Sequence, residues 1–253
     1  MLIDTHCHLD FPEFDKDRDE VISRAKDSGL GYIINIGSSL KGSKESIVLA
    51  QKYDLVYATV GIHPHDADGA DTEVIKELDG LIKNNKVVAV GECGLDYYRN
   101  LSSHDNQREI FFTLINLAKS SDLPVVVHSR QAEEETLDIL KKQMPLRAVV
   151  HCFSADENFL RQYLDLGFYI SFTCNITYKK ANSLRNLVGL IPLNRLMLET
   201  DAPFLPPEGL RGQRNEPRAV KILCQEIAKI KGLDFNEVAS VTTKNAKEFF
   251  RLP

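Results

Sequence analysis

The feature that most constrains the fold of this chain is an alternation, from end to end, between short β-rich runs and longer stretches with helical spacing of apolar residues. The β-rich runs are Leu2–Asp4, Tyr32–Ile36, Leu55–Val60, Lys86–Gly91, Leu123–Val127, Ala148–Val150, Phe168–Phe172 and Arg195–Leu198. Apolar residues recur at helical intervals in residues 15–28, 43–53, 72–84, 105–121, 132–143 and 156–166. This alternation predicts parallel strands joined by helices.

A closed barrel is favoured over an open doubly wound sheet. Runs such as residues 87–90 and 125–127 are apolar without alternation, which is typical of strands that are covered on both faces. Both architectures contain such strands, but no glycine-rich nucleotide-binding fingerprint follows any of the runs. The length of 253 residues suits one eightfold barrel. We therefore predict an α/β protein, a (β/α)8 TIM barrel, as a single domain over residues 1–253.

The C-terminal part predicts a long loop and one helix beyond the eightfold pattern. Residues 201–217 are rich in proline, glycine and arginine, which favours a loop. Two helical stretches follow, at about residues 218–231 and 235–250. The second of them is the extra C-terminal helix.

The composition excludes several classes of protein. A net charge of -5 argues against binding nucleic acid through a globally basic surface, so such binding needs local clusters of lysine and arginine. No apolar run is long enough to cross a bilayer, and the first residues carry charges where a secretory signal would be apolar. We expect a cytoplasmic protein with no membrane association, and no feature indicates a protein partner. Five cysteines without a CxxC spacing indicate neither a disulfide framework nor a zinc knuckle.

Histidines and carboxylates gather where the predicted strands end. They are His6, His8, His63, Glu92, His128, His151 and Asp201. The carboxyl ends of all strands of a parallel barrel open on one face, so these side chains should converge on one pocket. Imidazole and carboxylate groups together suit divalent ions, and a carboxylate can bridge two of them. Glu92, which is central in chain order, is the expected bridge.

Seven segments, in their order and spacing, resemble the TatD-type deoxyribonucleases of the metal-dependent hydrolase superfamily. They are DTHCHLD, VGIHPHDA, GECGLDYYR, PVVVHSR, VVHCFSA, LETDAPFL and RNEP. The resemblance covers nearly the whole chain and shows no departure at a predicted metal-ligand position. It implies a barrel with two divalent ions, magnesium, manganese or zinc, and hydrolysis of phosphodiester bonds in DNA.

The resemblance also implies roles for the individual residues. His6 and His8 would hold one ion and His128 and His151 the other, with Glu92 between them. Asp201 would contact the first ion and the attacking water. A carboxylate in the position of Asp201 can take the proton of the water. Asp201, together with the bridging Glu92, is therefore expected to be catalytic.

Basic residues in the predicted loops should favour a polyanionic substrate. They are Arg99, Arg130, Lys179, Lys180, Arg211, Arg214 and Arg218. Arg130 is expected to contact a phosphate, and His63 to hydrogen-bond a phosphate oxygen or the leaving group, or else to support a metal ligand. His65 and His104 are expected in loops without a role, and Glu199 is expected to be buried without a catalytic part.

Two other functions stay open. The first is a hydrolase of the same superfamily that acts on a C–N or C–O bond, as in a lactone, an amide or an aminoacyl ester. The second is a metal-dependent nucleic-acid-binding protein without turnover. The basic loop residues argue against a neutral small substrate, and the intact set of ligands argues against a loss of turnover.

Overall fold

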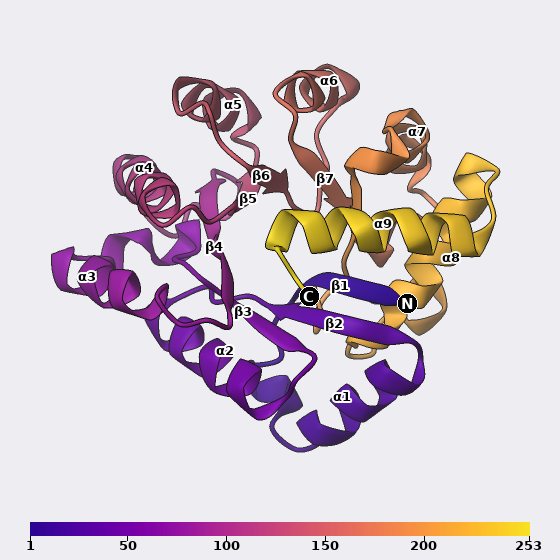
Figure 1. The fold of residues 1–253 in the computed structure, drawn as a ribbon. Coiled ribbons are helices and arrows are strands. Elements are labelled where there is room, and N and C mark those ends of the chain that lie inside the picture. Colours follow the sequence, from indigo (N-terminus) through magenta and orange to yellow (C-terminus); the bar gives the residue numbers. More distant parts are fainter.

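The computed structural model describes residues 1–253 and contains eight parallel strands that pair in chain order (Figure 1). The strands are β1 (Leu2–Cys7), β2 (Leu30–Asn35), β3 (Val56–Val60), β4 (Val87–Asp96), β5 (Val125–Arg130), β6 (Ala148–Val150), β7 (Tyr169–Phe172) and β8 (Leu196–Leu198). The end of β1 meets the chain that leaves β8, where Cys7 bridges to Ala202 and the Asp201 N–H donates to the His6 carbonyl at 2.8 Å. The predicted TIM barrel is therefore confirmed, as a nearly closed barrel.

Eight helices lie around the outside of the barrel, and a ninth crosses one end of it (Figure 1). They are α1 (Arg18–Asp27), α2 (Leu40–Lys52), α3 (Thr72–Leu81), α4 (His104–Ser120), α5 (Glu133–Lys142), α6 (Glu157–Asp165), α7 (Asn182–Leu190), α8 (Val220–Lys231) and α9 (Phe235–Phe250). Side-chain N-caps begin five of them, and the capping residues are Ser39, Asp71, Ser103, Asp156 and Asp234. None of the helices is both long and apolar enough to cross a membrane.

Three strands, β1, β4 and β5, extend further at their carboxyl ends than the sequence patterns predicted. β4 runs to Asp96 with an irregular register between Val90 and Cys93, so Glu92 lies within the strand and does not follow it. Gly94 makes the close approach to β5 possible: its φ is +145°, and a Cβ there would lie 1.9 Å from the His128 carbonyl oxygen. This contact lets β4 and β5 pair as far as Arg130, which also places His128 inside a strand.

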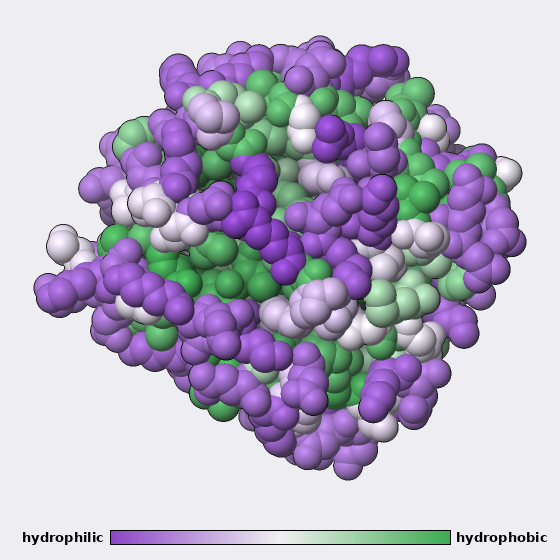
Figure 2. All heavy atoms as spheres, in the orientation of Figure 1, coloured by the Kyte–Doolittle hydropathy of each residue, from purple (hydrophilic) through white to green (hydrophobic).

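Helix α9 closes the end of the barrel where the strands begin. Asn245 donates hydrogen bonds to the carbonyls of Leu193 and Leu196, both at 2.8 Å. Phe249 and Phe250 pack into a buried cluster with residues from strands around the barrel. These are Ile3, Ile34, Val88, Ala89, Val126, Val149 and Met197. In Figure 1 the helix crosses in front of the strands, and Figure 2 shows that hydrophilic residues cover most of this face. The opposite end of the barrel is left for the site.

Candidate metal centre

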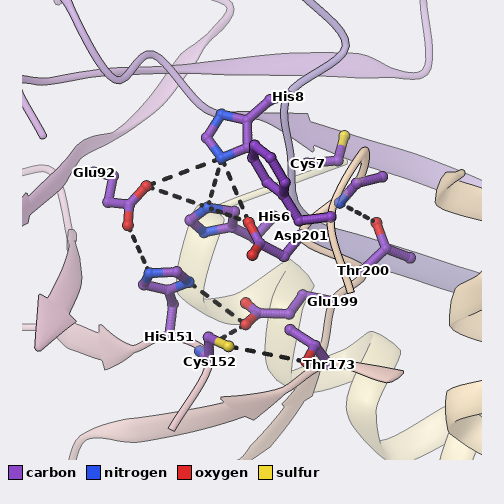
Figure 3. A network of polar contacts seen from close by, with 12 residues as sticks. His6, Cys7, His8, Glu92, His151, Cys152, Thr173, Glu199, Thr200 and Asp201 are labelled. Carbon is purple, nitrogen blue, oxygen red and sulfur yellow. Dashed lines mark hydrogen bonds and ion pairs between the residues drawn. The ribbon is translucent and has the colours of Figure 1, made fainter. Parts of the chain in front are cut away.

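The ends of five strands bring the six predicted ligands together. His6 lies in β1 and His8 directly follows it, Glu92 lies in β4, and His128 lies in β5. His151 comes directly after β6, and Asp201 follows β8 by three residues. Figure 3 shows His6, His8, Glu92 and Asp201 turned toward one another, with His151 on the other side of Glu92.

One group of ligand atoms consists of His6, His8, Glu92 and Asp201. The two histidine Nε2 atoms lie 3.3 Å apart. Asp201 Oδ1 lies 3.7 Å from His6 Nε2 and 3.5 Å from His8 Nε2, and Glu92 Oε2 lies 3.5 Å and 4.0 Å from the same two atoms. Four ligands in a tetrahedron around an ion at about 2.0–2.2 Å would be about 3.3–3.6 Å apart. The measured distances of 3.3–4.0 Å are close to this range, so His6, His8 and Glu92 could together hold a divalent ion, with Asp201 against the two histidines.

A second group lies on the other oxygen of Glu92. Its Oε1 atom is 2.8 Å from His128 Nδ1 and 2.6 Å from His151 Nε2, and these two nitrogens are 3.2 Å apart. Glu92 thus offers one oxygen to each pair of histidines, which is the arrangement that a bridging carboxylate needs. His63, which we had assigned to the substrate, has its Nε2 atom 3.6 Å from the same oxygen and is close enough to belong to this group.

The electrostatics favour an ionised carboxylate among imidazoles. Burial opposes the ionisation of Glu92, but the surrounding histidines, His151 and His63 foremost, hold its pKa well below the usual range. Burial lowers the pKa of His63 well below its ordinary value and so favours the neutral form of this imidazole. Burial acts in the same direction on His151, but Glu92 and Glu199 raise the pKa of His151 well above its ordinary value. Neutral imidazole is the form that binds metals.

Asp96 is a functional residue that the sequence analysis missed. Its Oδ2 atom lies 3.2 Å from His128 Nε2 and 2.9 Å from His65 Nε2. Its Oδ1 atom accepts hydrogen bonds from the N–H groups of Tyr98 (3.0 Å) and Arg99 (2.8 Å). Burial opposes its ionisation, but the hydrogen bonds from His128, Arg99 and His65 keep the pKa of Asp96 well below the usual range. Glu92, Gly94 and Asp96 are two residues apart, so on a strand they would share one face. The sequence analysis did not use this signal because the predicted strand ended at Gly91.

Two expectations about the remaining histidines need correction. His65 lies in the short helix Pro64–Gly69 and contacts Asp96, so it belongs to the surroundings of the centre. His104 is the first residue of α4, and its ring stacks on Tyr97 with centroids 3.6 Å apart. The expected loop positions were wrong for both.

Glu199 supports the centre from behind His151. It is buried as expected, and its Oε1 atom lies 3.6 Å from His151 Nδ1. It also accepts hydrogen bonds from the Cys152 N–H (2.6 Å) and the Ser171 hydroxyl (2.7 Å). A carboxylate behind a histidine fixes the ring orientation and the tautomer of a ligand.

Asp201 is the most accessible carboxylate of the centre. Its side chain is 16% exposed, whereas those of Glu92, Asp96 and Glu199 are 4% exposed or less. Only Asp201 among these four carboxylates combines contact with the histidines and access from solvent. It is therefore the carboxylate that an incoming water or substrate can reach.

The basic residues near the centre fall into two sets. Arg214 and Arg218 pair with Glu216, and Arg214 also pairs with Asp17 at 2.6 Å, so these two arginines hold the loop after β8. Arg214 is 25% exposed and bound by two carboxylates, which argues against its expected place in a substrate-facing ring, whereas Arg218 is 52% exposed and its expected place stays a prediction. Arg130 is exposed and lies over the ring of Tyr98, 4.0 Å from its centroid, so its charge is free to meet an anion.

Comparison with known proteins agrees with the fold and shows the family. The model of the family described as TatD related DNase matches residues 3–251. The chain is 40% identical to the metal-dependent hydrolase YabD of Bacillus subtilis (strain 168), over the full length of both. It is 37% identical to the 3'-5' ssDNA/RNA exonuclease TatD of Erwinia tasmaniensis, over 99% of this chain and 100% of that one. The crystal structure of YJJV, a TatD homologue from Escherichia coli K12, superposes with a TM-score of 0.94 at 32% identity and covers 100% of this chain and 98% of that chain. The chain therefore belongs to the TatD-related DNase family of metal-dependent hydrolases.

Proposed function

We propose that this protein is a deoxyribonuclease that hydrolyses phosphodiester bonds in DNA with two divalent ions, magnesium, manganese or zinc. The ions are held by His6, His8, Glu92, His128, His151 and Asp201. The position of Glu92 supports this best, because each of its oxygens faces a different pair of histidines. When bound, the ions would acidify a water molecule and stabilise the negative charge that grows on the phosphoryl oxygens.

The protein's own groups supply the proton transfer in this proposal. Asp201 takes the proton of the attacking water as general base, because it is the carboxylate at the open side of the centre. Glu92 stays ionised between the two pairs of histidines and keeps the two positions close to each other.

The substrate assignment depends on the rim of the pocket. Arg130, exposed at the end of β5, binds a phosphate of the strand, and His63 hydrogen-bonds a phosphate oxygen or the leaving group. The name of the Erwinia relative, which refers to single-stranded DNA and RNA, supports a nucleic-acid substrate. A neutral lactone or amide would make no use of Arg130.

A cleavage assay tests the proposal. Purified protein is incubated with single-stranded DNA, double-stranded DNA or RNA in manganese or magnesium, with EDTA and Glu92→Gln as controls. We expect DNA cleavage that requires the metal and is lost in Glu92→Gln. Absence of cleavage by wild type with its metal bound would contradict the proposal. Hydrolysis of a lactone, an amide or an aminoacyl ester, or binding of DNA without cleavage, would then identify which alternative is correct.

A further inference from the structure

An exposed aromatic ring lies beside the metal centre. Phe204 follows Asp201 by three residues, and 48% of it is exposed. Its centroid is 6.3 Å from that of His8 and 6.0 Å from that of Phe11. Phe11 stacks in turn on His8, with centroids 4.7 Å apart and an angle of 28° between the rings. Two phenylalanine rings therefore border the centre at His8, and one of them keeps a large apolar surface in solvent.

The backbone that carries Phe204 is held firmly in place. Buried Asn215 donates hydrogen bonds to the carbonyls of Phe204 at 2.8 Å, Leu205 at 3.3 Å and Thr200 at 3.0 Å. The Asn215 N–H donates to the Pro203 carbonyl at 3.0 Å. Four hydrogen bonds of one residue thus hold the loop, so the backbone that carries the ring needs little ordering when a ligand arrives.

Positive charge lies in the same pair of loops. The Glu208 N–H donates to the Thr177 hydroxyl at 2.9 Å and so joins the loops that follow β7 and β8. These loops carry exposed Lys179, Lys180 and Arg211. The guanidinium of Arg211 lies over the Tyr178 ring, 4.8 Å from its centroid. A phosphate backbone that leads away from the centre past Phe204 would therefore meet cationic side chains.

We propose that Phe204, backed by Phe11, is a stacking subsite for the nucleobase next to the scissile phosphate. This inference rests on the proposed nuclease function and deepens it. An exposed aromatic ring in loops that also carry cationic side chains is how proteins bind single strands without reading their sequence. Bases inside a duplex have both faces covered by their neighbours. The subsite therefore takes an unpaired base, from a single strand or a frayed end.

Binding to oligonucleotides with and without bases tests the subsite. The probes are a fluorescein-labelled decanucleotide with phosphorothioate linkages, which resist cleavage, and a fully abasic strand with the same linkages and length. Dissociation constants are measured by fluorescence anisotropy in manganese. We expect Phe204→Ala to weaken binding of the normal strand by about 10- to 100-fold and to leave binding of the abasic strand unchanged. Phe204→Trp should bind the normal strand as wild type does.

A matched control separates stacking from a general loss of apolar surface. Phe112 on α4 is 49% exposed, nearly the same fraction as Phe204, so Phe112→Ala removes an equivalent ring elsewhere. The subsite would be overturned if Phe204→Ala and Phe112→Ala bound the normal strand equally well, or if Phe204→Ala bound the normal and the abasic strand more weakly by the same factor. Neither result would contradict the nuclease function. If wild type neither bound nor cleaved any oligonucleotide, the proposed function would fail together with the subsite. Metal content and thermal melting of each variant show whether the centre and the fold are unchanged.

Discussion

Asp201 differs from the other carboxylates of the centre in its access to solvent. Its Oδ1 atom lies within 3.7 Å of the Nε2 atoms of His6 and His8, and its side chain is the most exposed of the four carboxylates. A group in this place can act as a ligand, as a base or as both. Asparagine keeps the size and one oxygen of aspartate but cannot accept a proton at neutral pH, so it separates the two roles.

We expect Asp201→Asn to keep most of its metal and its DNA binding while kcat falls. A general base contributes about 10²- to 10⁴-fold, and the loss should lie toward the upper end of this range. Turnover is measured at saturating manganese, with metal content determined on the same samples. A fall in kcat of less than about tenfold, with metal retained, would reduce Asp201 to an ordinary ligand.

Asp96 is placed to set the tautomer of a metal-bound His128. Its carboxylate lies 3.2 Å from His128 Nε2 and can only accept, so in a neutral imidazole it favours the proton on Nε2 and leaves Nδ1, which faces Glu92, free to bind a metal. An asparagine in place of Asp96 would still accept hydrogen bonds from the N–H groups of Tyr98 and Arg99 through its oxygen. Its NH2 group would then face the imidazole of His128. The proton of His128 would then move to Nδ1, where it blocks metal binding.

Asp96→Asn should therefore weaken one metal position by about 10- to 100-fold, the usual effect of losing such a carboxylate. Isothermal titration of manganese into metal-free protein measures both positions. Asp105→Asn, on an exposed aspartate of the neighbouring helix α4, is the control and should bind metal as wild type does. Unchanged affinity at both positions in Asp96→Asn would show that this carboxylate does not orient His128.

At the scale of elements, a cluster of ion pairs fastens the loop after β8 to both ends of α1. Glu216 binds Arg24 at 2.8 Å and Arg214 at 3.2 Å, and Arg214 also binds Asp17. Burial opposes the ionisation of Glu216, but Arg24, Arg218 and Arg214 lower its pKa. Hydrogen bonds from Arg214 and Arg24 lower the pKa of Asp17 to about 2. This cluster keeps in place the loop that carries Asp201 and Phe204.

Because its pKa is lower in the folded state, Glu216 stabilises the fold above its unfolded pKa of about 4.3 and loses this effect as the pH falls through the folded value. We expect Glu216→Gln to lower the free energy of unfolding by roughly 1–3 kcal/mol at pH 7. The difference from wild type should shrink as the pH falls below about 4, toward the lowered pKa of Glu216 in the folded state. Urea denaturation at several pH values measures this difference in the free energy of unfolding.

Glu157→Gln is the control, because it breaks an exposed pair with Arg161. It should lower the free energy of unfolding by less than about 1 kcal/mol. An equal loss in both variants would refute a special role for the cluster.

The same elements show which parts of the structure the sequence can predict. Eight strands followed from apolar runs, and convergence of the six ligands followed from the topology of a parallel barrel. Helix α7 was not predicted; its nine residues include Asn182, Asn186 and Gly189, which have low intrinsic helix propensity. Asp96 was missed because the end of β4 depends on how closely Gly94 approaches β5, and a contact between strands leaves no local pattern. Ion pairs such as Arg214 with Asp17 join residues far apart in the chain, so loop composition alone assigned Arg214 to the wrong role.

At the scale of the whole molecule, stability and chemistry lie at opposite ends of the barrel. Phe249 and Phe250 of α9 fill the end where the strands begin, and the ligands gather at the other end. Barrels of this kind commonly separate a stabilising face from a functional face. A change in α9 should therefore affect the free energy of unfolding and leave the metal centre as it is.

Phe250→Ala tests this separation, since Phe250 is only 2% exposed. Removal of a buried phenylalanine side chain typically costs about 3–5 kcal/mol. We expect a loss of this size in urea denaturation, with metal content and kcat of the folded enzyme unchanged. Phe112→Ala, at the exposed ring on α4, should change stability by no more than about 0.5 kcal/mol. Loss of metal in folded Phe250→Ala would show that the two ends are coupled.

The number of metal ions per chain tests the central claim most directly, since Glu92 is proposed to join two metal positions. Native mass spectrometry, calibrated by elemental analysis, counts the ions in wild type, His6→Ala, His128→Ala and Glu92→Ala. The account predicts two ions in wild type, one in each histidine variant and fewer than one in Glu92→Ala, because two neighbouring cations without the shared carboxylate repel each other. One ion in wild type, or an unchanged count in Glu92→Ala, would contradict it.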